Sequence, residues 1–202
     1  MALNLEEIDR SMSFHSSEAT TISCGTVTFD LAQSMILLIW NKQLEIYQLP
    51  KGRKNIDEDM LSTALRETSE ETGVIATPLR LRIATRATPP SCTVPESSED
   101  HETSADDPRN DEVTDNRLST EFLGCCRYPD PQSTIPAMKV VFFFAATANS
   151  TAPRGNRPLE DAEKLVPVWT KASDAACTLR FNAESEIVRK ALADVRRSGY
   201  TI

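Results

Sequence analysis

Three glutamates in the first half of this chain are spaced in a way that could serve metal chemistry. Glu67, Glu70 and Glu71 stand at offsets of three and four residues, which bring side chains together along one flank of an α-helix. Carboxylates about 6 Å apart repel by about 3 kcal/mol in a partly shielded site, so they are either fully solvated or joined by a cation. Oxygen ligands of this kind suit Mg²⁺ or Mn²⁺, which also accept phosphate oxygens.

The segment that carries these acids is predicted to be a helix over residues 58–72. Asp57 is the expected N-cap, and Gly73 can adopt the left-handed conformation that ends a helix. At 100° per residue, one face of this helix collects the residues expected to be buried: Met60, Leu61, Ala64, Leu65 and Thr68. An acidic flank on a surface helix is often only solvated, but a capped, half-buried helix behind a glycine loop favours a metal site.

A basic loop leads into the helix, with Lys51, Arg53 and Lys54 around Gly52. These three cations could hold a polyphosphate beside the carboxylates. A solvated basic turn is the alternative. If the first interpretation holds, the substrate is rich in phosphate.

The 26-residue stretch from Leu49 to Val74 resembles the signature of the Nudix hydrolases. That signature is a glycine, five residues, Glu, seven residues, Arg-Glu, an aliphatic residue, any residue, Glu-Glu, any residue, Gly and an aliphatic residue. The matching positions are Gly52, Glu58, Arg66, Glu67, Glu70, Glu71, Gly73 and Val74. Thr68 departs from the pattern, because it brings a hydroxyl to a position where an aliphatic side chain is usual.

The resemblance implies a role for each matching residue. Glu67 and Glu71 would be the main metal ligands, with Glu70 as a third and the carbonyl of Gly52 as a backbone ligand. Glu58 and Arg66 would hold the loop against the helix. Members of the family cleave a diphosphate linked to another moiety by adding water at phosphorus.

The resemblance therefore implies a Mg²⁺-dependent pyrophosphohydrolase, with Mn²⁺ as a second possible cofactor. The run Leu-Pro-Lys-Gly is most similar to enzymes that act on diadenosine polyphosphates or diphosphoinositol polyphosphates, although messenger-RNA decapping relatives share part of it. The alternatives are an ADP-ribose or other nucleoside-diphosphate-sugar hydrolase, and a Nudix-like module that binds a phosphorylated ligand without cleaving it. The last would be favoured by loss of a signature acid, and all the acids are present.

The elements around the signature predict an α/β fold, which we expect to be the Nudix-type α/β/α sandwich with a mixed β-sheet. Two strands connected by the turn around residues 41–43 lead into the signature loop, and later apolar runs supply the rest of the sheet. The expected strands are 22–30, 34–41, 44–50, 77–87, 121–129, 138–149 and 165–169. A helical turn over 173–179 and a final helix with Asn182 as N-cap complete the layout. The apolar stripe of that helix is Ile187, Val188, Ala191, Leu192 and Val195.

The chain is expected to form one domain over residues 21–199, preceded by a flexible arm over residues 1–20. An insertion at about 87–117 has the composition of disorder and holds most of the acid excess. Between Pro95 and Asn116 nine acids stand against Arg109, an excess of 8 that equals the net charge of −8: Glu96, Glu99, Asp100, Glu102, Asp106, Asp107, Asp111, Glu112 and Asp115. The insertion could occupy the basic loop when no substrate is bound, or act only as a solubilising spacer.

Composition also limits the partners and the compartment. The rest of the chain is close to neutral, which argues against binding of extended nucleic acid. The longest apolar runs are too short for a membrane span, and no secretory signal is evident at the N-terminus. Five cysteines without metal-ligand spacing fit a reducing compartment, so we expect a cytoplasmic protein, with the nucleus also possible. The oligomeric state stays open.

Two groups of residues outside the signature are further candidates for the site. In parts of the family a carboxylate from a late loop supplies the base or another metal ligand, and Glu160, Asp161 and Glu163 lie in such a loop. The identity of the general base is therefore open between Glu67 and a late-loop acid. Arg80 and Arg82 either line the substrate cleft or face water, as does Arg86.

Overall fold

The computed structural model of the chain describes residues 4–88, 117–158 and 163–202. The acidic insertion, including Cys92, lies outside the described residues except at residues 87–88 and 117. Glu160 and Asp161 also lie outside them. Predictions about their structure therefore stay predictions.

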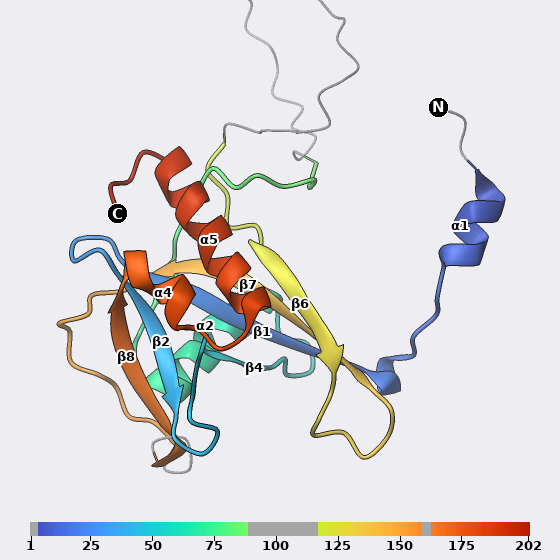
Figure 1. Cartoon of the computed structure of the whole chain (residues 1–202), viewed down its shortest axis with the longest axis horizontal. Coiled ribbons are helices and arrows are strands. Elements are labelled where there is room, and N and C mark those ends of the chain that lie inside the picture. The colour runs from blue at the N-terminus through green and yellow to red at the C-terminus, as the bar shows by residue number, and fades with distance from the viewer. Residues whose placement is uncertain (1–3, 89–116, 159–162) are drawn as a thin grey trace, which may run out of the picture.

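An eight-stranded mixed sheet forms the centre of the molecule (Figure 1). Its main path runs β3-β2-β1-β7-β5, with β4 paired to β1, β6 to β7 and β8 to β2. Strands β1 and β7 are parallel, and the other pairs are antiparallel. The strands are β1 (Thr20–Asp30), β2 (Met35–Asn41), β3 (Ile46–Gln48), β4 (Lys51–Arg53), β5 (Thr77–Pro78), β6 (Gly124–Pro129), β7 (Met138–Thr147) and β8 (Leu165–Lys171).

Helices cover both faces of this sheet, which confirms the predicted α/β/α sandwich (Figure 1). Helix α2 (Met60–Thr72) lies on one face, and α4 (Ala172–Thr178) and α5 (Asn182–Arg197) lie on the other. The larger core lies under α4 and α5 and includes the predicted stripe of α5. A smaller core joins Ala64 of α2 to Cys24 and Phe144 of the sheet. The signature helix is therefore held on the sheet by little apolar surface.

The start of the chain contains structure that the sequence analysis did not predict. A seven-residue helix, α1 (Leu5–Ser11), and a 3₁₀ turn (Ser17–Ala19) precede β1. Helix α1 has no buried residue and extends away from the sheet in Figure 1. The flexibility of this arm stays a prediction.

The signature helix begins later than predicted. Asp59, not Asp57, is its N-cap, and its side chain accepts a hydrogen bond from Ser62 N. Asp57 has a φ of 62°, which places it in a left-handed turn. Gly73 ends the helix in the left-handed conformation, as predicted. For α5 the cap is Phe181, and Asn182 is the first helical residue.

The segment expected to be one strand over 77–87 forms only the two-residue β5 and an isolated bridge between Leu81 and Ser119. Leu79, Leu81 and Ile83 are buried and the arginines between them are exposed, so the predicted alternation holds. The backbone does not continue as a strand, and at Arg82 its N donates to the hydroxyl of Ser198, the C-cap of α5.

Candidate functional site

Arg66 organises the acidic residues of the signature. Its guanidinium donates to both carboxylate oxygens of Glu58, at 2.8 and 2.9 Å. One nitrogen, Nη1, donates to Glu67 and to Glu70, both at 2.8 Å. The other, Nη2, also reaches the carbonyl of Arg53 at 2.9 Å. A planar, delocalised fork can serve several acceptors at once, so Arg66 joins the loop to the helix.

The third glutamate is held by the neighbouring strand. Glu71 accepts a hydrogen bond from the backbone N of Lys51, at 2.8 Å from its Oε2. Glu67 lies against the next residue of β4, Gly52. The structure thus brings Glu67 and Glu71 to β4, and Glu70 shares one donor nitrogen of Arg66 with Glu67.

Gly52 is required by this close approach. A Cβ at this position would lie 1.8 Å from Oε2 of Glu67, well inside van der Waals contact. Any side chain here displaces either the strand or the carboxylate. The signature therefore needs a glycine here because a side chain would not fit, and not because the backbone adopts a conformation that favours glycine.

We expect Gly52→Ala to lower kcat/KM by about 100-fold, because a carboxylate moved by about 1 Å loses productive geometry. Gly155→Ala is the matched control, since a Cβ there would meet its nearest atom at an ordinary 3.6 Å. Steady-state kinetics on both variants, with circular dichroism to verify folding, test this. Equal activity of the two variants would contradict the tight fit at Gly52.

Hydrogen bonding and burial move the pKa values of two glutamates in opposite directions. Hydrogen bonds from Arg66 lower the pKa of Glu58 to about 2. Burial raises the pKa of Glu67, and this outweighs its bond to Arg66. Glu58 therefore stays ionised at acid pH as a structural anion, whereas Glu67 is a better proton acceptor than an ordinary glutamate.

The shift at Glu58 predicts a pH dependence of stability. A carboxylate whose pKa falls on folding stabilises the native state above its unfolded value near 4.5, and this contribution is lost as pH falls toward 2. We expect Glu58→Gln to be less stable than the wild type at pH 6 and to lose less stability between pH 4.5 and 2. Thermal melts across that range measure this. Parallel curves for the two proteins would contradict it.

The hydroxyl of Thr68, where the sequence departs from the signature, has hydrogen-bond partners within the protein. Its hydroxyl lies 2.7 Å from that of Thr26 on β1, which in turn lies 2.7 Å from that of Thr28. It also donates to the carbonyl of Ala64 at 2.7 Å. All three threonines are fully buried. The hydroxyl that departs from the signature thus links α2 to the sheet.

The three cations of the basic loop have different environments. The ammonium of Lys51 forms an ion pair with Glu184 of α5 at 3.3 Å, and its side chain is only 12% exposed. The second oxygen of Glu184 accepts from Leu49 N at 3.0 Å. Arg53 pairs with Asp130 at 3.3 Å, but its side chain remains 53% exposed. Lys54 donates to the carbonyl of Asn55. Lys51 therefore positions the loop, and Arg53 and Lys54 are nearer to solvent.

Solved structures with a similar architecture identify the fold. A Nudix hydrolase from Nitrosomonas europaea superimposes with a TM-score of 0.52, at 12% sequence identity, over 86% of this chain and 89% of that chain. The chain has the Nudix fold.

Another similar structure is an Ap4A hydrolase from C. elegans, with a TM-score of 0.48, 16% identity, and coverage of 86% of this chain and 97% of that chain. No protein-family profile matches the sequence, and no curated protein matches it either.

The donors on the signature helix of this Nudix fold fit Mg²⁺ in their chemistry, since all are oxygens. In this structure one oxygen of each carboxylate accepts from Arg66 or from the amide of Lys51. Within the residues that the structure describes, no three Asp, Glu, His or Cys side chains are grouped closely enough to hold a metal ion as they stand. Convergence on one ion therefore requires side-chain rotations away from these partners.

The described part of the late loop supports the end of α2. Arg157 donates from Nη1 to the carbonyls of Glu71 and Leu165, at 2.8 and 2.9 Å, and Gly155 N donates to Gly73 O at 2.7 Å. Arg157 thereby satisfies a carbonyl in the last turn of α2. Glu163 is exposed, and no described contact joins it to the signature acids. Its role, like that of Glu160, stays a prediction.

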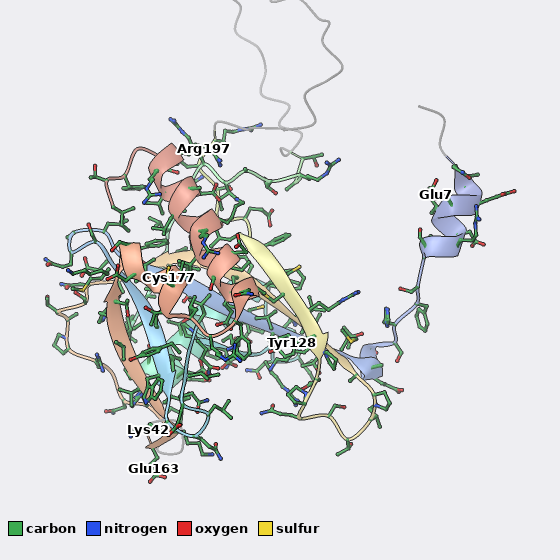
Figure 2. All side chains as sticks on the ribbon, in the orientation of Figure 1. Glu7, Lys42, Tyr128, Glu163, Cys177 and Arg197 are labelled. Carbon is green, nitrogen blue, oxygen red and sulfur yellow. The ribbon has the colours of Figure 1, made fainter. Side chains whose placement is uncertain are left out.

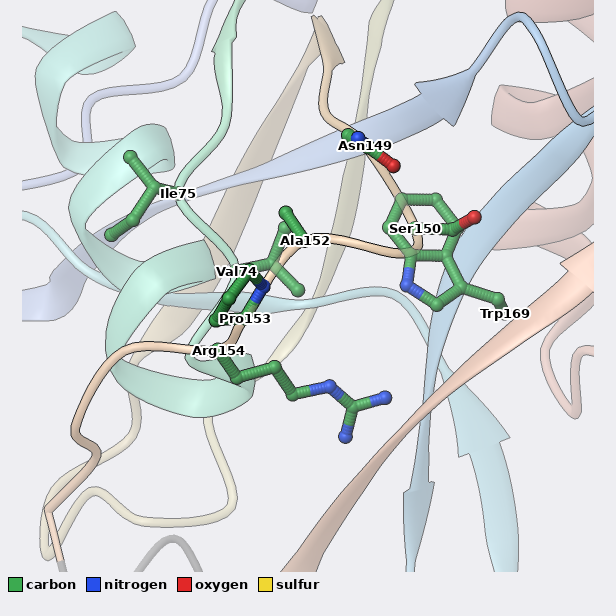
Figure 3. A pocket seen from close by; sticks show the side chains of 8 residues that line it. All are labelled: Val74, Ile75, Asn149, Ser150, Ala152, Pro153, Arg154 and Trp169. Atoms are coloured by element: carbon green, nitrogen blue, oxygen red, sulfur yellow. The ribbon is translucent and has the colours of Figure 1, made fainter.

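A small pocket lies beside this loop (Figure 3). Three segments line it: the residues just after α2, the loop that follows β7, and strand β8. The lining residues are Val74, Ile75, Asn149, Ser150, Ala152, Pro153, Arg154 and Trp169. Its volume of about 50 Å³ is well below the ~300 Å³ at the lower end of ligand pockets. It holds no more than water in this conformation.

Glu184, Asp130 and Arg157 were missed by the sequence analysis. All three lie outside the signature stretch, with Glu184 in the first turn of α5. Leu49 and Arg53, which donate to Glu184 and Asp130, are 135 and 77 residues away from them in the chain, so no local spacing predicts these contacts.

The four described cysteines are unpaired, and none of the described helices is long and apolar enough to cross a membrane.

Proposed function

We propose that this protein is a Mg²⁺-dependent pyrophosphohydrolase that cleaves a polyphosphorylated small molecule by water attack at phosphorus. The observation that carries the proposal is the arrangement of Glu67 and Glu70 on one guanidinium nitrogen, with Glu71 fixed by the adjacent strand. Diadenosine polyphosphates and diphosphoinositol polyphosphates are the leading substrates. A cytoplasmic location stays a prediction.

Glu67, Glu70, Glu71 and the carbonyl of Gly52 would hold the metal. When bound, Mg²⁺ neutralises phosphate oxygens and lowers the pKa of a coordinated water. Arg66 orients two of the carboxylates, and Lys51 orients the third through its backbone amide. In the reaction, water oxygen bonds to phosphorus, the bridging P–O bond breaks, and the water proton passes to a base, for which buried Glu67 and a late-loop acid remain candidates.

The test is a substrate panel in Mg²⁺ and in EDTA, run in ¹⁸O-labelled water. The panel contains diadenosine tetraphosphate, a diphosphoinositol polyphosphate, ADP-ribose and a sugar nucleotide. We expect Mg²⁺-dependent release with ¹⁸O in one phosphate product, and fastest turnover of the first two compounds. Preference for the last two would support the nucleoside-diphosphate-sugar alternative. Tight binding of a panel member without cleavage would support the non-catalytic module.

A further inference from the structure

One end of the sheet is not covered by α5. That helix sits directly on β6 at Gly124, where a Cβ would lie 2.8 Å from Cδ1 of Ile187. In Figure 1 the first residues of β1 and β7 and the end of β6 project beyond the N-terminal end of α5. In Figure 2 Tyr128 marks this end of β6. On the face of the sheet that α5 covers elsewhere, the side chains at this uncovered end belong to polar residues.

Strand register identifies these residues. Ser23 of β1 is paired with Arg53 of β4, and Thr21 of β1 with Lys139 of β7. Lys139 is also paired with Tyr128 of β6. Paired residues share a face of a sheet, and alternate residues of one strand do so too. These five side chains therefore stand on one face, on the same side as Lys51.

Two of the three cations on this face are balanced by acids. Lys51 has its ion pair with Glu184, and Arg53 has its pair with Asp130. Asp130 is buried and also accepts from the hydroxyl of Thr21 at 2.6 Å. These two pairs leave no net charge.

Lys139 is the cation without such a partner. Its ammonium forms no hydrogen bond or ion pair with any described residue, although the side chain is half-buried. Burial lowers its pKa, and the nearby charges of Lys51 and Arg53 lower it further, whereas Asp130 and Glu71 act in the opposite direction. A half-buried ammonium near two other cations is unfavourable unless an anion joins it.

Ser23 is the second unsatisfied group. It is fully buried, and its hydroxyl is the one buried side-chain polar atom in the described part of the chain that lacks a hydrogen-bond partner. Buried polar groups are nearly always bonded, so an exception calls for a partner that the protein itself does not supply. Ser23 lies between Arg53 and the β7 strand that carries Lys139.

We propose that Lys139, Ser23 and Arg53 form a subsite for a phosphate group of the substrate other than the two that share the scissile bond. This inference rests on the proposed function. An ammonium, a hydroxyl and a guanidinium supply the donors that a phosphate oxyanion requires. The long side chains of Arg53 and Lys139 swing aside to admit the anion to Ser23, and Arg53 is already half-exposed.

Strand β4 connects this subsite to the signature acids. Within three residues it carries the amide that holds Glu71, the glycine under Glu67, and Arg53. Glu71 is also among the charges that act on Lys139. The acids lie on the α2 side of the sheet and the subsite lies on the α5 side, so a substrate that fills both places has to pass around the sheet at β4 and needs three or more phosphates. ADP-ribose, whose two phosphates share the scissile bond, cannot fill both.

Tripolyphosphate binding in EDTA tests the subsite without turnover. We expect Lys139→Ala to weaken binding by about tenfold to a hundredfold in isothermal titration, as loss of a charge-assisted contact implies. Lys171→Ala is the matched control. It removes the same charge from an exposed residue at the end of β8, and we expect binding within about twofold of the wild type.

Ser23→Ala separates binding from folding. Removal of a hydroxyl with no partner leaves the melting temperature unchanged or raised, whereas a structural role for the hydroxyl would lower it. We expect tripolyphosphate affinity to fall by about fivefold. For turnover, Lys139→Ala should raise KM for diadenosine tetraphosphate about tenfold or more and leave KM for ADP-ribose unchanged.

The outcomes separate the subsite from the proposed function. If both variants bind tripolyphosphate as tightly as the wild type, the subsite is wrong, whatever the enzyme hydrolyses. If binding weakens as expected but no panel compound is cleaved, the subsite stands and the proposed hydrolysis falls. Equal KM increases for diadenosine tetraphosphate and ADP-ribose would also overturn the subsite, because they would place Lys139 on the scissile pyrophosphate.

Discussion

Glu71→Gln is expected to lower kcat by about a thousandfold while the protein remains folded. The change removes one negative charge from the carboxylates that would hold Mg²⁺, and loss of several kcal/mol of transition-state stabilisation corresponds to a factor of this size. The glutamine amide oxygen can still accept from the backbone N of Lys51, so the contact between α2 and β4 is retained. Turnover is measured by phosphate release in Mg²⁺.

Two further variants make this result interpretable. Glu70 is more exposed than Glu67, at 43% against 13%, so Glu70→Gln should cost less, on the order of tenfold. Glu186→Gln makes the same chemical change on the exposed face of α5, 71% exposed, and should leave kcat within about twofold. Full activity of Glu71→Gln would remove the metal assignment, and equal losses in all three variants would indicate a general charge effect.

Local spacing predicts the signature helix well because its determinants lie within one short segment. Glu67 and Glu70, three residues apart on the helix, both accept from one nitrogen of Arg66, and Gly73 ends the helix as expected. The start was wrong by two residues. Both Asp57 and Asp59 are good N-caps by type, and the choice depends on Glu58, which must remain in the loop to reach Arg66.

Contacts between distant segments decide what the sequence could not predict. Lys51 was expected to face substrate, but the end of a helix more than 130 residues later supplies a buried carboxylate for it. The segment after Thr77 has the alternation of a strand, but its amide at Arg82 donates to Ser198, the residue that caps the C-terminal end of α5. In both cases the competing partner comes from the final helix, whose docking position is set by the whole core.

The hydroxyl of Thr68 illustrates a different limit. Sequence pattern alone marks it as a defect in the signature, because the position usually carries an aliphatic side chain. The structure supplies Thr26 on the facing strand as its partner. A polar residue on a buried face can thus be predicted to need a partner, but the partner itself is found only when the register of helix against sheet is known.

Arg66→Met is expected to lower the free energy of unfolding by about 2–4 kcal/mol in EDTA, and to abolish most activity. The side chain is 25% exposed and serves Glu58, Glu67 and Glu70 together with the carbonyl of Arg53. Its removal leaves three carboxylates close together without a cation, and a partly buried pair broken on one side is costly. Urea denaturation measures the loss.

The effect of added Mg²⁺ distinguishes the two roles of this cluster. A divalent ion that binds Glu67 and Glu70 only in the folded state should restore part of the stability of Arg66→Met. It should not restore the part that came from the contact between Arg66 and Glu58. Arg66→Lys retains the charge but not the fork, so it should recover less than half of the loss. Arg196→Met, on the exposed face of α5, should cost under about 0.5 kcal/mol. If Arg66→Met were as stable as Arg196→Met in EDTA, the guanidinium would not organise the site, and the carboxylates would be held by the strand alone.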